Sequence, residues 1–222
     1  MSIEEIVASL KSKRLEKTRV KDKAPFREQD NWKAKALAYK ELLEKYSEFI
    51  ELHEEKTIPE LKALVTPKHE AVASLRTDLF EQLSVEYLEG DSFEKFVSLA
   101  SDFVQSLPAI GSELSFSFWL APEQSLKVKA GDSMDKALLL CSLLLSAEIP
   151  AKIRIVELNN GLRQPIVLAS LGDRVVLCDC SGKKKPSFGL NDESVVGTYS
   201  FEGTNAVKSL YEYNDSFYKD FE

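Results

Sequence analysis

The stretch Gly131-Asp-Ser-Met-Asp135 places a small residue, two acids and a hydroxyl directly before an apolar repeat. The repeat has helical spacing and consists of Met134, Ala137, Leu138, Cys141, Leu144 and Leu145. A side chain at a helix start meets unpaired backbone N–H groups and the positive end of the helix dipole, which favour an anion or a thiolate. The simpler interpretation makes Asp132 or Ser133 a helix N-cap and Asp135 a first-turn acid.

Three stretches of the chain, FVQSLP, FWLAPEQSL and GDSMDKALLLCSLLLSAEIPAKIRIVEL, resemble transglutaminase-like proteins of the kind common in archaea. Those proteins carry a G-D-C-x-D-x-A-x-L-L motif, followed by a strand that begins with histidine and a strand that ends in aspartate. In that family the cysteine attacks an acyl group, the histidine takes the proton, and the aspartate orients the histidine. The resemblance covers residues 103–181 and implies a papain-type fold.

Carried over position by position, the resemblance places the family's cysteine on Ser133, its histidine on Gln164 and its aspartate on Asp179. Only the aspartate is retained. A serine hydroxyl needs a base to become a nucleophile, and a glutamine amide cannot accept a proton at neutral pH. This degenerate triad is therefore not expected to run the usual acyl transfer. The resemblance also marks three candidate binding residues, which are Trp119, Asp132 and Asp135.

The three cysteines form an odd set without CxxC spacing, so neither a disulfide framework nor a zinc site is indicated. Cys141 lies on the apolar face of the predicted helix, where a core position is the simpler interpretation. Cys178 and Cys180 share one face of a predicted strand, opposite Asp179, and small buried residues are again the usual case there.

Only two histidines are present, His53 and His69, and both fall in predicted helical segments. The simpler interpretation makes His53 part of the apolar stripe of a helix and His69 a surface residue. Either one could replace the missing base if it folded back onto Ser133. With so few histidines, we expect no metal site, and no cofactor is indicated.

The first half of the chain predicts helices. Residues 31–55 carry a seam with alternating spacings of four and three, formed by Trp32, Ala36, Tyr39, Leu43, Tyr46, Ile50 and His53. The stripe is wider than a strict two-position seam, which favours packing on the domain or in a helical hairpin over an isolated coiled coil. Thr66-Pro67 predicts a further helix start. Residues 91–107 carry a regular helical stripe.

The second half predicts strands. Leu114, Phe116 and Phe118 alternate with serines, and strand-like runs follow at 152–158, 165–171, 174–180 and 194–201. Helices first and strands later predict an α+β protein with an antiparallel sheet. Together with the resemblance, this predicts an N-terminal helical and linker segment, 1–65, and a transglutaminase-like domain, 66–222, whose sheet packs on the helix that starts near Ser133.

Composition limits the function classes. The net charge of −7 argues against general nucleic-acid affinity, because phosphate binding needs concentrated Lys and Arg. The longest apolar run, residues 137–145, is far shorter than a membrane span. The first residues, MSIEEIVASLKSKR, contain no apolar signal region, so we expect a cytoplasmic protein.

Three functions remain open from the sequence. The first is a catalytically inactive transglutaminase-like protein that serves as a binding or scaffold module, with a protein partner recruited through its N-terminal helices. The second is an enzyme, either a serine hydrolase with an unidentified base or a thiol enzyme whose cysteine was replaced by Ser133. Gln164 weighs against the replaced cysteine, since the base is missing as well. The third is a purely structural helical scaffold, supported by the seam.

Overall fold

The computed structural model describes residues 28–47, 56–83, 91–110, 119–182 and 184–221. The chain divides into two compact units, Met1–Lys45 and Tyr46–Glu222. The predicted domain boundary after residue 65 lies inside the second unit.

Helix α2 (Glu28–Lys45) belongs to the first unit. Its apolar side chains Leu37 and Tyr39 are 62% and 64% exposed. Part of the predicted seam is thus open to solvent in this structure. Other predicted features, the seam positions Ile50 and His53 and the strand at 114–118, lie outside the described residues.

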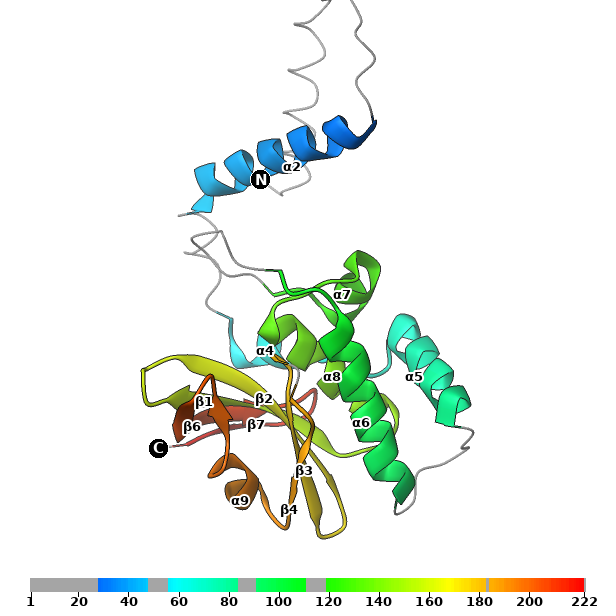
Figure 1. Ribbon diagram of the computed structural model, residues 1–222, viewed down its shortest axis with the longest axis vertical. Helices are drawn as coiled ribbons and strands as arrows, with labels where there is room; N and C mark the ends of the chain where they lie inside the picture. The colour runs from blue at the N-terminus through cyan, green and yellow to red at the C-terminus, as the bar shows by residue number, and fades with distance from the viewer. Residues whose placement is uncertain (1–27, 48–55, 84–90, 111–118, 183, 222) are drawn as a thin grey trace, which may run out of the picture. The chain divides into compact units, whose positions relative to one another are not determined.

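The second unit is built from six described helices and a seven-stranded sheet (Figure 1). The helices are α4 (Ile58–Ala63), α5 (Glu70–Leu83), α6 (Asp91–Ser106), α7 (Pro122–Val128), α8 (Ser133–Ser146) and α9 (Asp192–Val196). The strands are β1 (Ala151–Leu158), β2 (Arg163–Leu171), β3 (Arg174–Asp179), β4 (Ser187–Gly189), β5 (Ser200–Phe201), β6 (Thr204–Tyr213) and β7 (Tyr218–Asp220). All pairings are antiparallel, in the order β4-β3-β2-β1-β6-β5, and β7 also pairs with β6.

Two apolar clusters cover the two faces of the sheet. The larger cluster joins α5, α6 and α8 to one face through strand residues that include Ile153, Val167 and Val176. The smaller cluster lies on the other face, where residues such as Ile166 and Leu177 pack with α9 and Tyr199. Side chains alternate between the faces of a strand, so neighbouring residues of β2 and β3 belong to different clusters. The predicted α+β fold, with α8 packed on an antiparallel sheet, is confirmed.

Local sequence explains most of these elements. The stripe of α6 is confirmed, because Phe93, Phe96 and Val97 are completely buried. The hairpin between β2 and β3 turns at Gly172, whose φ of 58° lies in the left-handed region that glycine adopts without strain.

Two predictions of elements were wrong in detail, and one long strand was not predicted. The helix expected at Thr66 begins at Glu70, because the Thr66 carbonyl accepts from the His69 N–H in a turn and the helical bonds start at the His69 carbonyl, which accepts from the Ala73 N–H at 3.0 Å. Of the expected strand over 194–201, only Ser200–Phe201 form a strand, β5, whereas residues 194–196 belong to helix α9, which Asn191 caps through a 2.9 Å bond from the Ser194 N–H. Strand β6 was missed because many of its residues are half-exposed and its pairing with β1 is non-local.

Candidate functional site

Asp132 is the N-cap of α8. Its Oδ1 accepts hydrogen bonds from the backbone N–H groups of Met134 and Asp135, both at 2.8 Å. This confirms the simpler interpretation of Asp132, since these bonds satisfy two of the four free N–H groups at the helix start. Ser133 is the first helical residue and is partly exposed.

Asp135 ties the start of α8 to its surroundings. Its Oδ1 accepts from the Leu120 N–H at 2.7 Å, and its Oδ2 accepts from the Asp132 N–H at 3.0 Å. Only 3% of Asp135 is exposed, and burial raises the pKa of its carboxyl, against the lowering effect of the two backbone hydrogen bonds. Asp135 therefore acts as a structural anchor for the turn that carries Ser133.

Two further contacts fix this turn. The backbone of Gly131 bonds to the end of the α6 segment, with its N–H on the Pro108 carbonyl at 3.1 Å and its carbonyl on the Ile110 N–H at 3.3 Å. A Cβ at Gly131 would lie 2.8 Å from the Asp135 Cβ, so the close approach requires glycine. Trp119, the third candidate binding residue, packs at the edge of the core, with the Lys56 ammonium 5.5 Å from its ring centroid.

Gln164 and Asp179 come together on one face of the sheet. Asp179 pairs with Ile166 across β2 and β3, and Gln164 lies two residues before Ile166 on β2. Positions two apart on a strand, and positions directly opposite in an antiparallel pair, share a face. Gln164 and Asp179 are both buried, at 5% and 2% exposed. The register therefore keeps the predicted base and orienting positions adjacent.

Asp179 sits among polar groups. Its Oδ1 accepts from the N–H of Ser181 at 2.9 Å and also from the Ser181 hydroxyl. Its carbonyl accepts from the Gln105 amide of α6 at 2.9 Å. Its Oδ2 and the Tyr199 hydroxyl are both buried without a hydrogen-bond partner. Burial and the neighbouring Asp179 charge raise the pKa of Tyr199.

A hydrogen-bonded triad is not formed in this structure. Within the described residues, no hydrogen bond links Ser133 to Gln164 or Asp179. Residues of α8 pack in the larger apolar cluster, whereas Gln164 and Asp179 belong to the face that carries the smaller one. His69 is exposed, and its Nδ1 accepts from the Ala71 N–H at 3.2 Å, which accounts for it as a local cap of α5.

Sequence reasoning missed Lys136. This lysine lies in the second turn of α8, three residues after Ser133, and only 5% of it is exposed. The Ser-x-x-Lys spacing was visible in the sequence. The burial was not, because charged residues on amphipathic helices are usually solvated.

The cysteines are all free and buried. Cys141, Cys178 and Cys180 belong to the larger apolar cluster, as the simpler interpretation expects. Burial raises the pKa of Cys178 to about 12 and also raises the pKa values of Cys141 and Cys180. These thiols are therefore protonated at neutral pH and weakly nucleophilic.

A second polar cluster holds α9 on the sheet. Arg154 of β1 is 1% exposed and binds Glu212 of β6 at 2.7 Å, Asp192 at 3.0 Å and Glu193 at 2.8 Å. Lys152 contacts Asp192 at 2.6 Å and Glu212 at 3.0 Å. Each buried charge in this cluster has an opposite partner, so the cluster serves architecture.

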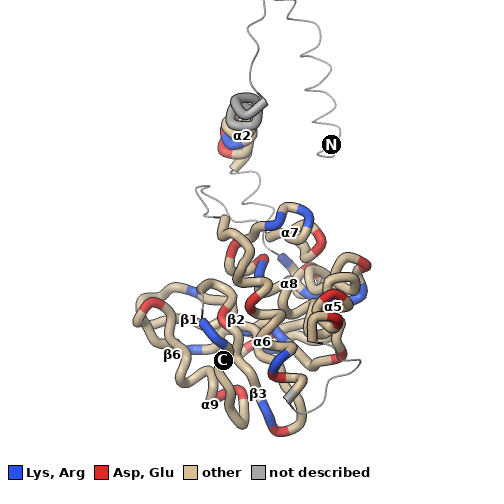
Figure 2. Tube along the Cα trace, turned by 45° about the vertical axis from the view of Figure 1, so that its right-hand side comes forward, with Lys and Arg blue, Asp and Glu red and all other residues tan. Residues whose placement is uncertain are grey.

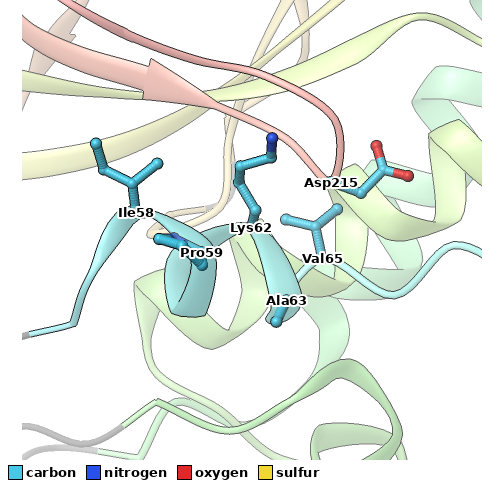
Figure 3. A pocket seen from close by; sticks show the side chains of 6 residues that line it. All are labelled: Ile58, Pro59, Lys62, Ala63, Val65 and Asp215. Carbon is cyan, nitrogen blue, oxygen red and sulfur yellow. The ribbon is translucent and has the colours of Figure 1, made fainter.

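The larger of two described pockets has a volume of about 480 Å³ (Figure 3), and Ser133 is not among its lining residues. It is lined by Ile58, Pro59, Lys62, Ala63, Val65 and Asp215. Its Lys62 ammonium donates to the Ser216 carbonyl at 2.6 Å, so this cation is already engaged.

Charged residues are distributed over the second unit, with Lys and Arg interspersed among Asp and Glu (Figure 2). In the described ranges, no group of three or more His, Cys, Asp or Glu side chains is placed to hold a metal ion. Among the described helices, none is long and apolar enough to cross a membrane.

No family model matches the sequence, and no curated protein matches it. Among solved structures, the chain is similar to Legionella pneumophila LapG in an EGTA-treated form, at 12% identity and a TM-score of 0.49, over 71% of this chain and 87% of that chain. The calcium-bound form of LapG gives 12% identity and a TM-score of 0.48, over 71% and 91% of the two chains. A TGase gives 12% identity and a TM-score of 0.40, over 75% of this chain and 44% of that chain. These are similarities of fold, and no activity is carried over from them.

Proposed function

We propose that the second unit is a transglutaminase-like domain that has lost the cysteine–histidine reaction and works as a binding module. The observation that carries this proposal is the pair of residues at the nucleophile and base positions. Ser133 replaces the thiol, and Gln164, which cannot take a proton, replaces the base.

The scaffold around the lost site supports a retained role. Gly131, Asp132 and Asp135 form a tight, capped start of α8, and the Gln105 amide donates to the Asp179 carbonyl. A binding module needs a rigid backbone with fixed polar groups but no catalytic groups, because recognition depends on shape and on fixed polar groups.

We propose further that the first unit recruits a protein partner. The exposed Tyr39 and Leu42 of α2 support this role, because they lie three residues apart and share one side of the helix, and exposed apolar patches mark interaction sites. Replacing both residues by aspartate should leave the melting temperature of the second unit unchanged. The same change should abolish association of the chain with its protein partner, measured by mass in solution. Association that survives both substitutions would exclude this surface.

The test of the lost reaction restores both groups, in the variant Ser133→Cys with Gln164→His. The unmodified protein should show neither transglutaminase nor thiol-protease activity. Because α8 packs on one face of the sheet and Gln164 belongs to the other, the double variant should alkylate its introduced thiol no faster than the Ser133→Cys single variant does. Both should react faster than the three native cysteines, whose raised pKa values keep them protonated.

The result that would overturn this proposal is specific. Transamidation or peptide cleavage by the unmodified protein that stops after alkylation of its native cysteines would show that a thiol reaction persists. The single variants act as matched controls, since they carry the same changes in size without a complete pair.

A further inference from the structure

The smaller of the two described pockets has a volume of about 180 Å³ and lies between the start of β1, the end of β2, the start of α9 and the turn from β6 to β7. Five of its nine lining residues are apolar, and the polar ones are Lys152, Ser170, Asp192 and Asn214. An apolar wall with a few polar groups is typical of a small-molecule site. The volume holds roughly six waters at about 30 Å³ each, so the ligand must be small.

The sheet register brings polar groups to one side of this pocket. Lys152 lies directly opposite Leu168 across β1 and β2, and Ser170 follows Leu168 by two residues. These three positions share one face of the sheet. It is the face on which α9 packs, since Leu168 belongs to the smaller apolar cluster. Asp192, the first residue of α9, completes this side of the pocket.

The Asp192 carboxylate has one oxygen left for a ligand. The Lys152 ammonium at 2.6 Å and the Arg154 guanidinium at 3.0 Å both bind its Oδ2. In the described part of the chain, no group donates a hydrogen bond to its Oδ1, and 26% of the side chain is exposed. The Ser170 hydroxyl is partly exposed and also has no hydrogen-bond partner among the described residues. The pocket therefore offers two oxygens to a ligand that donates hydrogen bonds.

The charges beside the pocket favour a cation. Asp192 belongs to the Arg154 cluster, in which three carboxylates contact only two cations. Water screens Glu193, which is 73% exposed, whereas the Asp192 and Glu212 side chains are 26% and 5% exposed. A cationic donor on the free Asp192 oxygen would balance the cluster.

The aromatic part of the wall favours a planar cation. Phe217 lines the pocket, and Asn214 holds it in place by accepting from the Phe217 N–H at 3.1 Å and donating to the Ala151 carbonyl at 3.0 Å. A guanidinium is planar, weakly hydrated and able to stack on an aromatic ring, and its forked N–H groups can reach two acceptors at once. An ammonium is more strongly hydrated, so it loses more on entering a mostly apolar pocket.

We propose that this pocket binds a small guanidinium ligand, whose N–H groups donate to the Asp192 Oδ1 and the Ser170 Oγ while its carbon chain packs on the apolar wall. The binding is non-covalent. This inference goes beyond the proposed function and does not depend on it, because Ser133, Gln164 and Asp179 are not among the lining residues.

The experiment titrates the isotope-labelled full chain with n-propylguanidinium chloride and follows backbone amide shifts by NMR. We expect saturable shifts at Lys152, Ser170, Asp192 and Phe217. The matched probe is n-propylurea, which has nearly the same shape and no charge, at equal ionic strength. It should bind about 10-fold more weakly, because hydrogen bonds that involve a charged group are stronger than neutral ones. Equal affinities of the two probes, or shifts that do not saturate at these residues, would overturn the site.

Ser170→Leu tests the pocket without touching the ion pairs. It removes the hydroxyl and fills the space, so the saturable shifts should disappear. The matched control is Ser187→Leu, which changes an exposed serine of β4 outside the pocket and should bind like the unmodified protein. Unchanged binding by folded Ser170→Leu would refute the assignment. If that variant does not fold, the comparison of n-propylguanidinium with n-propylurea decides.

Asp192→Asn tests the charge, and it should also abolish the saturable shifts. Its control is Asp173→Asn, which changes an exposed acid of the hairpin between β2 and β3. Because Asp192→Asn also loses its ion pairs with Lys152 and Arg154, circular dichroism and melting must show that it is folded. Folded Asp192→Asn that binds as tightly as Asp173→Asn would exclude the charged contact.

A capped peptide, acetyl-glycyl-arginyl-glycinamide, distinguishes two sources of the guanidinium group. Tighter binding of the peptide than of n-propylguanidinium would assign the pocket to an arginine side chain of a partner, and weaker binding would assign it to a free guanidino compound. These outcomes are separate from a failure of the proposed function. A persisting thiol reaction is detected by cysteine alkylation, and no cysteine lines this pocket.

Discussion

The carboxylate of Asp135 accepts a hydrogen bond from the backbone N–H of Leu120 at 2.7 Å, which joins the second residue after the start of α8 to the segment before α7. The other oxygen accepts from the Asp132 N–H at 3.0 Å. One side chain thus fixes both sides of the turn that presents Ser133.

Asp135→Asn should lower the free energy of unfolding by about 1–3 kcal/mol, the cost of leaving a buried group unpaired. An amide has one accepting oxygen, so it cannot serve both N–H groups. Urea unfolding measures the loss. The control Asp78→Asn changes an exposed acid of α5 and should leave the midpoint in place. Equal midpoints for the two variants would contradict the anchoring role.

Gly131→Ala should also destabilise the second unit. Its Cβ would lie 2.8 Å from the Asp135 Cβ, which forces the start of α8 to move. The expected loss is about 1–3 kcal/mol by thermal unfolding, as for other overpacked sites. Gly182→Ala is the matched control, because a Cβ there meets nothing within 4 Å. A Gly131 variant as stable as this control would show that the turn relaxes freely.

Stability should rise with pH in an interval set by Lys136. Burial lowers the folded-state pKa of Lys136, so between that pKa and the ordinary lysine value the unfolded chain binds more protons than the folded one. The free energy of unfolding therefore increases as pH rises through this interval. Lys136→Met should remove this increase, and Lys127→Met should retain it. Identical pH dependence in the two variants would mean that Lys136 is not desolvated.

Removing Arg154 should be far more costly than removing an exposed arginine. Arg154→Met leaves Glu212, 3% exposed, with only Lys152 to neutralise it, and we expect a loss of about 3 kcal/mol. Arg174→Met is the control, because its pair with Glu94 is exposed and contributes below about 1 kcal/mol. Chemical denaturation of both variants measures the difference. Similar losses would show that the Arg154 cluster is weakly coupled to folding.

The sequence alone determined the features that depend on near neighbours in the chain. The stripe of α6 and the cap at Asp132 were both expected, and Gly172-Asp173 between two predicted strands is also a turn signal, because periodicity, capping and tight turns are set within a few residues. The Gly172 turn also sets the register between β2 and β3. This register keeps Gln164 and Asp179 on one face of the sheet.

The tertiary structure decided what depends on residues far apart in the chain. The Ser142 hydroxyl of α8 accepts from the Thr66 N–H and so ties the segment before α5 to a helix far along the chain. The packing of α8 among α5, α6 and the strands β1 and β2 accompanies the burial of Lys136, and no local pattern encodes that burial. Pairings between distant segments depend on the summed packing of many side chains, whereas the sequence displays only the preferences of each segment by itself.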